Sequence, residues 1–235
     1  MEQGSHPARR ALGILSLLAL LVSSTVAAQG NPQGTDPDLP AFTQARAVFE
    51  QALNGNSKAL DQSLEQFPPL ASSGRPVALV ALAYLGASQT LQAREAWMPW
   101  TKMHAAEKGL ATLDKALNRS AEAAELRFQD TPVSLEVKLV AAITFRQVPD
   151  AVFHRRDQGR RLVQDVLAHR QFPDSPALFR ARSWEEAAIV ARERNDRNAE
   201  IDALRQTLQA VSGSNDTYAS KLAESSRQRL KELGA

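Results

Sequence analysis

The sequence has no cysteine among its 235 residues. This absence excludes a thiol nucleophile, a cysteine-ligated zinc ion, an iron–sulfur cluster and any disulfide. There is also little excess charge of one sign, because 28 Lys and Arg face 26 Asp and Glu. A dedicated nucleic-acid binder would need a strongly basic face, so no nucleic-acid partner is expected. The 43% of hydrophobic residues is enough for an ordinary globular domain with its own core.

Long hydrophobic runs are scarce as well. The apolar run Ala11–Val22 has twelve residues and follows Arg9 and Arg10. A membrane-spanning helix needs about 20 residues, so this run is too short for an anchor. No later run approaches that length, and no membrane span is expected in the mature chain.

Small residues follow the apolar run, and Val26 and Ala28 fit the −3 and −1 positions of a signal peptidase site. We therefore predict that residues 1–28 are a signal peptide, cleaved before Gln29, and that the protein is exported to the periplasm or secreted. Residues 29–40 are rich in Gly, Pro and polar side chains, which predicts a flexible lead-in.

The chain beyond residue 40 is expected to be helical, because apolar residues recur three and four positions apart and no stretch alternates strictly. The prolines of Phe67-Pro68-Pro69 and Phe172-Pro173 are expected to end two helices. The stretch 133–147 is apolar on most sides, which predicts a central, buried helix. The expected helices cover residues 41–53, 58–67, 76–97, 99 to at least 118, 133–147, 157–170, 175–194, 197–212 and 216–233.

These segments predict an all-α fold in a single domain, 41–235. Short connections favour antiparallel neighbours. Small residues such as Gly86 and Gly109 stand where helices approach closely, as in helical repeats of 30 to 40 residues. We predict antiparallel helix pairs stacked as a degenerate tetratricopeptide-like (TPR-like) α-solenoid. The alternative is an irregular helical bundle, because no two segments align across a whole repeat.

Two blocks carry a resemblance, Ala93–Lys102 (AREAWMPWTK) and Ala106–Leu117 (AEKGLATLDKAL), followed by Leu135-Glu136-Val137 with Arg146 and Pro149. They resemble a group of exported bacterial TPR-like proteins of unassigned function. The likeness covers roughly residues 76–170. It implies a fold and a compartment, and it supplies no catalytic residue to transfer.

Few residues suggest chemistry. The histidines beyond residue 28 are His104, His154 and His169, and none stands three or four positions from another, so no helix presents two imidazoles to a metal. Nucleotide-binding and serine-hydrolase motifs are absent. Glu107 and the pair Glu185-Glu186 stand on helices rich in opposite charges. We therefore expect no enzyme activity, no metal and no cofactor.

The densest charge in the chain is the segment 155–161, which holds Arg155, Arg156, Arg160 and Arg161. One interpretation is an anion site near a helix start. The other, which we favour, is a solvated loop with Asp157 as the helix N-cap and with local ion pairs. The four arginines remain candidate partner-binding residues.

Two tryptophans, Trp97 and Trp100, flank Pro99, which disfavours helical geometry at Met98 and forces a bend. The pair either forms an exposed platform for a peptide or glycan, or fills the corner and holds two helices together. We favour the packed interpretation, because large aromatic side chains are costly to expose without a partner. Both residues are kept as candidate partner-binding residues.

The leading functional hypothesis is an exported, non-enzymatic TPR-like scaffold that binds a protein or peptide partner in a concave groove. The alternative is a small-ligand-binding protein or a hydrolase with its site inside the curve. A pocket that holds buried carboxylates would favour this alternative.

Overall fold

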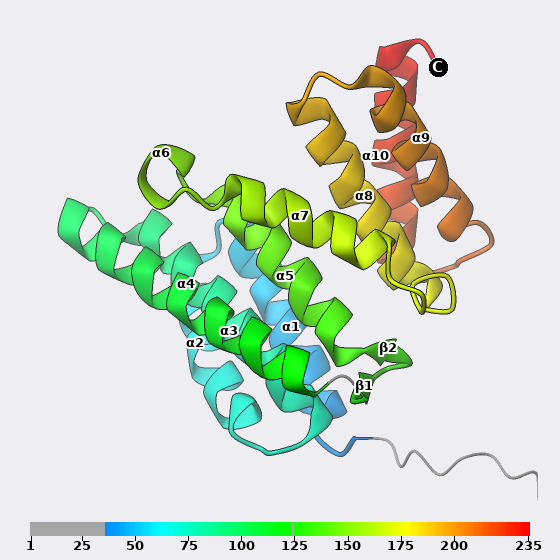
Figure 1. The fold of residues 1–235 in the computed structure, drawn as a ribbon. Helices are drawn as coiled ribbons and strands as arrows, with labels where there is room; N and C mark the ends of the chain where they lie inside the picture. The colour runs from blue at the N-terminus through cyan, green and yellow to red at the C-terminus, as the bar shows by residue number, and fades with distance from the viewer. Residues whose placement is uncertain (1–35, 124) are drawn as a thin grey trace, which may run out of the picture. The chain divides into compact units, whose positions relative to one another are not determined.

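The computed structural model describes residues 36–123 and 125–235 (Figure 1). The expected signal peptide, 1–28, lies outside these residues, as does the lead-in up to residue 35. The first helix begins at Leu39, within the segment expected to be flexible, so that expectation is wrong for its last two residues.

The described residues form ten helices and one short hairpin, which confirms the all-α class. In chain order the elements are α1 (Leu39–Leu53), α2 (Ser57–Ala71), α3 (Pro76–Glu95), α4 (Pro99–Glu122), β1 (Arg127–Phe128), β2 (Thr131–Pro132), α5 (Val133–Gln147), α6 (Asp150–Phe153), α7 (Arg156–Leu167), α8 (Ala177–Glu193), α9 (Arg197–Ala210) and α10 (Thr217–Leu233).

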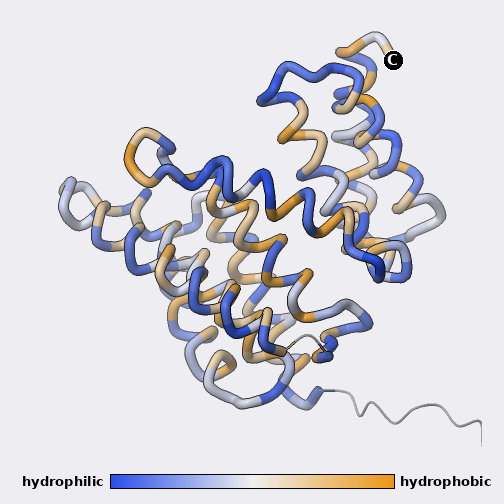
Figure 2. Tube along the Cα trace, in the orientation of Figure 1, coloured by the Kyte–Doolittle hydropathy of each residue, from blue (hydrophilic) through white to orange (hydrophobic). Residues whose placement is uncertain are grey.

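Helices that are close in sequence pack as pairs: α1 with α2, α3 with α4, α5 with α7, and α8 with α9 (Figure 1). The last helix, α10, packs against α9 and α8. Successive pairs meet through α2 with α3 and through α3 with α5. The expected central helix is confirmed, because Val133, Leu135, Val137 and Leu139 of α5 are all fully buried. Figure 2 shows hydrophobic residues along α3 and α5.

The helix expected to end at Phe67 instead continues through Pro68 and Pro69 to Ala71. Each proline removes one backbone hydrogen bond, which normally ends a helix. Phe67 and Leu70 are both buried here, and their packing keeps the last turn in place. Packing with the rest of the domain has therefore overridden the local preference.

The hairpin after α4 was not expected. Phe128 pairs with Thr131 across a turn in which Gln129 and Asp130 adopt positive φ angles of 47° and 63°. Positive φ at both central residues matches the twist of a tight two-residue hairpin. The Phe128 ring is buried, 5.0 Å from the ring of Phe42. The hairpin thus ends α4 at Glu122 and adds an aromatic ring to the core.

Close approach of α3 and α4 depends on the two expected glycines. A Cβ atom on Gly109 would lie 2.1 Å from Thr90 Oγ1 and 2.6 Å from the carbonyl oxygen of Gly86. No side chain fits at such distances, so these two helices pack backbone against backbone.

Candidate functional site

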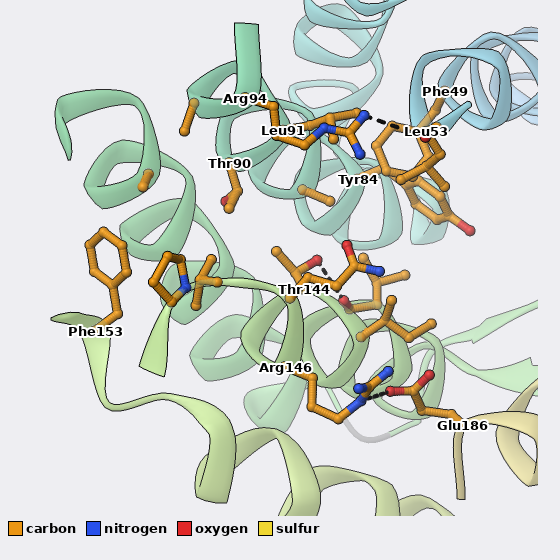
Figure 3. A pocket seen from close by; sticks show the side chains of 18 of the residues that line it. Phe49, Leu53, Tyr84, Thr90, Leu91, Arg94, Thr144, Arg146, Phe153 and Glu186 are labelled. Atoms are coloured by element: carbon orange, nitrogen blue, oxygen red, sulfur yellow. Dashed lines mark hydrogen bonds and ion pairs between the residues drawn. The ribbon is translucent and has the colours of Figure 1, made fainter. Parts of the chain in front are cut away.

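A cavity of about 720 Å³ lies along α1, α3, α5 and α8, which are the first helices of the four pairs. The start of α4, the short helix α6 and one residue of α10 complete its lining. Most of the lining is apolar, as with Phe49, Leu91 and Phe153 in Figure 3. We call this cavity the groove. Its volume and its apolar lining with a few polar groups are typical of binding sites.

One part of the groove is polar and contains Arg182 of α8. Arg182 Nη2 donates a hydrogen bond of 3.4 Å to the hydroxyl of Tyr84 on α3, and Nη1 lies 3.9 Å from Glu136 Oε2 on α5. The arginine side chain is 16% exposed. Burial lowers the pKa of Arg182, but Tyr84, Glu136 and Tyr218 together raise it by more than burial lowers it. The pKa is therefore above its ordinary value, and the guanidinium stays protonated.

Two other arginines of the groove are held by groups of the same chain (Figure 3). Arg94 donates hydrogen bonds to the carbonyl oxygens of Ala52 and Leu53, at 3.1 and 3.4 Å. These carbonyl groups are at the C-terminal end of α1, where they have no partner within the helix. Arg146 of α5 binds the carboxylates of Glu186 and Glu193 on α8. Arg94 Nη2 and the Nε and Nη1 atoms of Arg146 are therefore engaged.

Buried carboxylates also belong to this region. Glu136 and Glu186 are only 8% and 5% exposed. Burial raises the pKa of Glu136, while Arg182 and Arg46 lower it by less. Burial and the neighbouring Glu186 likewise raise the pKa of Glu185, against the opposing effect of Arg182. Buried carboxylates are the feature that was expected to favour a small-ligand site.

A second cavity, of about 280 Å³, adjoins the groove. The two cavities share Glu50, Arg182 and Tyr218 as lining residues. The second cavity is more polar and adds Arg46 and Lys221, among others. The groove therefore continues past Arg182, between α1, α8 and the start of α10.

The packed interpretation of the tryptophans is wrong. Trp97 is 83% exposed and Trp100 is 65% exposed. The bend at Pro99 is present, with Met98 in an extended conformation, but the corner needs no aromatic filling because Gly86 and Gly109 bring α3 and α4 together directly. Three more apolar side chains are exposed along the groove, namely Leu53, Met103 and Val152. Pro99 lines the groove, whereas neither tryptophan does.

The prediction for the arginine segment is confirmed only for ion pairing, and the expected loop is wrong, because residues 156–161 belong to α7. Arg155 binds both oxygens of Asp114, at 3.1 and 2.6 Å, and lies 5.1 Å from the centre of the Phe145 ring. Arg160 binds Asp157 at 3.1 Å. The Arg155 contacts join the start of α7 to α4 and α5, which gives this residue a structural role, whereas the Arg160 pair lies within α7.

One detail of that prediction is wrong, because Asp157 lies inside the first turn of α7 and Arg155 is its N-cap residue. The carboxylate that accepts a hydrogen bond from the Arg156 amide, at 3.0 Å, is that of Asp150. Arg156 is partly buried and Arg161 is exposed. Neither lines the groove.

The histidines do not form a site. His104 and His154 are exposed, while His169 is partly buried and its Nδ1 accepts a hydrogen bond from the Gln171 amide. In residues 36–123 and 125–235, no group of three His, Asp or Glu side chains is placed to hold a metal ion. None of the helices in the described ranges is both long enough and apolar enough to cross a membrane.

Sequence reasoning missed the polar part of the groove. Tyr84, Glu136 and Arg182 come from three different helix pairs, so no local spacing connects them. One signal was present: Glu136 is an acidic residue near the start of a largely apolar helix, and such a residue must find a partner when it is buried.

Comparison with known proteins adds no relative: no protein-family model matches the chain, and neither a curated protein nor a solved structure matches it.

Proposed function

We propose that this protein is an exported, non-enzymatic TPR-like scaffold that binds an extended segment of a protein partner in the groove. The observation that carries the proposal is the lining of the groove by α1, α3, α5 and α8, the first helix of each pair. Stacked helix pairs present such a row of helices on their concave side, and these surfaces bind polypeptides.

Exposed apolar side chains beside the groove support a protein partner. Leu53, Met103 and Val152 are exposed lining residues of the groove, and the exposed Trp97 and Trp100 stand on either side of its lining residue Pro99 in the sequence. Soluble proteins rarely expose such residues together except at interaction sites. Tryptophan is also enriched among the residues that contribute most to binding energy at interfaces.

Site-specific photo-crosslinking in cells that express the full chain tests this function. A photoreactive residue at Leu53 lies in the groove, and one at Leu126 is a matched control, since both leucines are 38% exposed and Leu126 does not line the groove. We expect a discrete crosslinked partner from position 53 and none from position 126. Equal crosslinking from both positions, or none from position 53, would contradict the proposal.

Amino-terminal sequencing of the same protein tests export. We expect the protein in the periplasm or medium to begin at Gln29. An intact Met1 in the cytoplasm would show that the chain is not exported.

A second candidate function, a small-ligand-binding protein, is favoured by two buried carboxylates, that of Glu136 beside Arg182 and that of Glu186 beside Arg146. Native mass spectrometry of protein purified from its expressing cells distinguishes the two functions. A bound small molecule of reproducible mass would support the second candidate, and protein that carries no added mass would favour the polypeptide partner.

A further inference from the structure

Arg182 has more hydrogen-bonding capacity than its neighbours use. A guanidinium carries five N–H donors in a planar fork. Within the part of the chain that the structure describes, Arg182 makes one hydrogen bond, to Tyr84 at 3.4 Å, and the 3.9 Å separation from Glu136 is too long for a second. Because Arg182 lines both cavities, a bound molecule can reach it.

Of the three arginines that line the groove, Arg182 makes the fewest hydrogen bonds to the chain. Arg94 and Arg146 line the same cavity, but two carbonyl oxygens already bind Arg94 Nη2, and two carboxylates bind Nε and Nη1 of Arg146. Arg182 is mostly buried, and a buried guanidinium gains most from a carboxylate that it binds with two parallel hydrogen bonds. Its 3.9 Å ion pair with Glu136 does not supply these two hydrogen bonds.

The course of the groove indicates where such a carboxylate stands in a partner. Apolar residues such as Leu91 and Phe153 line the groove on one side of Arg182. The second cavity continues on the other side, where its charged lining residues are Arg46, Lys221, Glu50 and Asp216. An extended chain can therefore run past Arg182 in both directions. This favours an acidic side chain within a segment over a carboxylate at the end of a chain.

We infer that Arg182 binds an Asp or Glu side chain of the partner segment, and that apolar residues on one side of this acidic residue fill the groove. The inference rests on the proposed function, because it specifies the chemistry of the segment that the same groove binds.

Two variants test the role of Arg182. The double variant Arg182→Met/Glu136→Gln removes both members of the ion pair, so that no buried charge is left without a partner. The single variant Glu136→Gln is the matched control, because it keeps Arg182 and removes the carboxylate that competes for it. Circular dichroism checks that each variant is folded.

The probe is a displayed library of random peptides. Peptides that bind are selected in separate experiments on the purified wild type and on each of the two variants. A peptide enriched by the wild type is then synthesised with its acidic residue and with the neutral amide in its place. Fluorescence anisotropy measures the affinity of both peptides for each protein. The comparison of the two peptides on the wild type needs no variant, so it holds even if the double variant does not fold.

We expect the wild type to enrich peptides with an acidic residue next to an apolar stretch, and the amide form to bind about tenfold more weakly. The Glu136→Gln variant should keep or increase this difference, and the double variant should lose it while still binding apolar peptides. Enrichment of apolar peptides without an acidic residue, or an undiminished difference in the double variant, would overturn the inference alone. A library that yields no groove-binding peptide would overturn the proposed function with it.

Discussion

Arg146 on α5 binds two carboxylates of α8 at once, those of Glu186 and Glu193. The Arg146 side chain is 9% exposed and that of Glu186 is 6% exposed, so the pair is largely shielded from water. Burial opposes the charge on Arg146, but hydrogen bonds and attraction from both glutamates raise its pKa overall. The link joins the third helix pair to the fourth along one side of the groove.

Removing one member of this ion-pair link should destabilise the folded protein. Arg146→Met leaves the carboxylate of Glu186 buried without its counter-charge, and we expect the free energy of unfolding to fall by about 3–5 kcal/mol. The double variant Arg146→Met/Glu186→Gln should lose less than the sum of the single variants. Chemical denaturation measures each value. Arg46→Met is the control, because its 3.9 Å pair with Glu50 is partly exposed and should contribute at most about 1 kcal/mol. Additive losses would show that the pair is not coupled.

The close packing of α3 and α4 predicts a strong effect at Gly109. Gly109→Ala places a methyl group where Thr90 and the Gly86 carbonyl stand, so the helices must separate. We expect the free energy of unfolding to fall by about 1–3 kcal/mol or more. The neighbouring exposed residue provides a control, since Lys108→Ala should change it by at most about 0.5 kcal/mol. If the two variants had the same free energy of unfolding, α3 and α4 would not pack backbone against backbone at Gly109.

Exposure of Trp97 and Trp100 predicts that they contribute little to stability. Trp97→Ala and Trp100→Ala should each change the free energy of unfolding by about 0.5 kcal/mol or less. Trp184→Ala should cost more, because that ring is partly buried and packs 5.8 Å from the ring of Phe172. In variants that keep a single tryptophan, emission from Trp97 or Trp100 should be red-shifted and readily quenched by acrylamide. Blue-shifted, protected emission from either would restore the packed interpretation.

The raised pKa of Glu136 predicts a pH dependence with a definite sign. Above the ordinary value of 4.5, the unfolded chain has lost the proton of Glu136, whereas the folded protein still holds it. The contribution of Glu136 to the free energy of unfolding therefore falls as pH rises from 4.5 through the raised pKa. Arg182 and Arg46 limit the effect without reversing it.

Urea unfolding of the wild type and of Glu136→Gln across this pH range measures that contribution as the difference between the two proteins. Other groups with a shifted pKa, such as Glu232 with its lowered pKa, are present in both proteins, so their effect cancels in the difference. We expect the wild type to lose stability relative to the variant as pH rises. A constant difference would show that Glu136 has an ordinary pKa in the folded protein.

The sequence by itself determined the helical class and most helix positions. The prediction for 133–147 matches α5 residue for residue, because a helix depends on hydrogen bonds between near neighbours and on an apolar pattern that can be read locally. The bend at Pro99 and the close approach at Gly86 and Gly109 were also predictable, since they follow from the covalent structure of proline and glycine.

Only the tertiary structure decided which side chains are buried at the corners and which charges meet. Pro68 and Pro69 stay inside α2 because neighbouring helices bury Phe67, and Trp97 is exposed although α3 and α4 pack closely at Gly86 and Gly109. Glu136 and Arg182 are far apart in sequence but lie 3.9 Å apart across two helix pairs. Burial and pairing of this kind depend on how the pairs stack, and that depends on the sum of many weak contacts, which no local pattern contains.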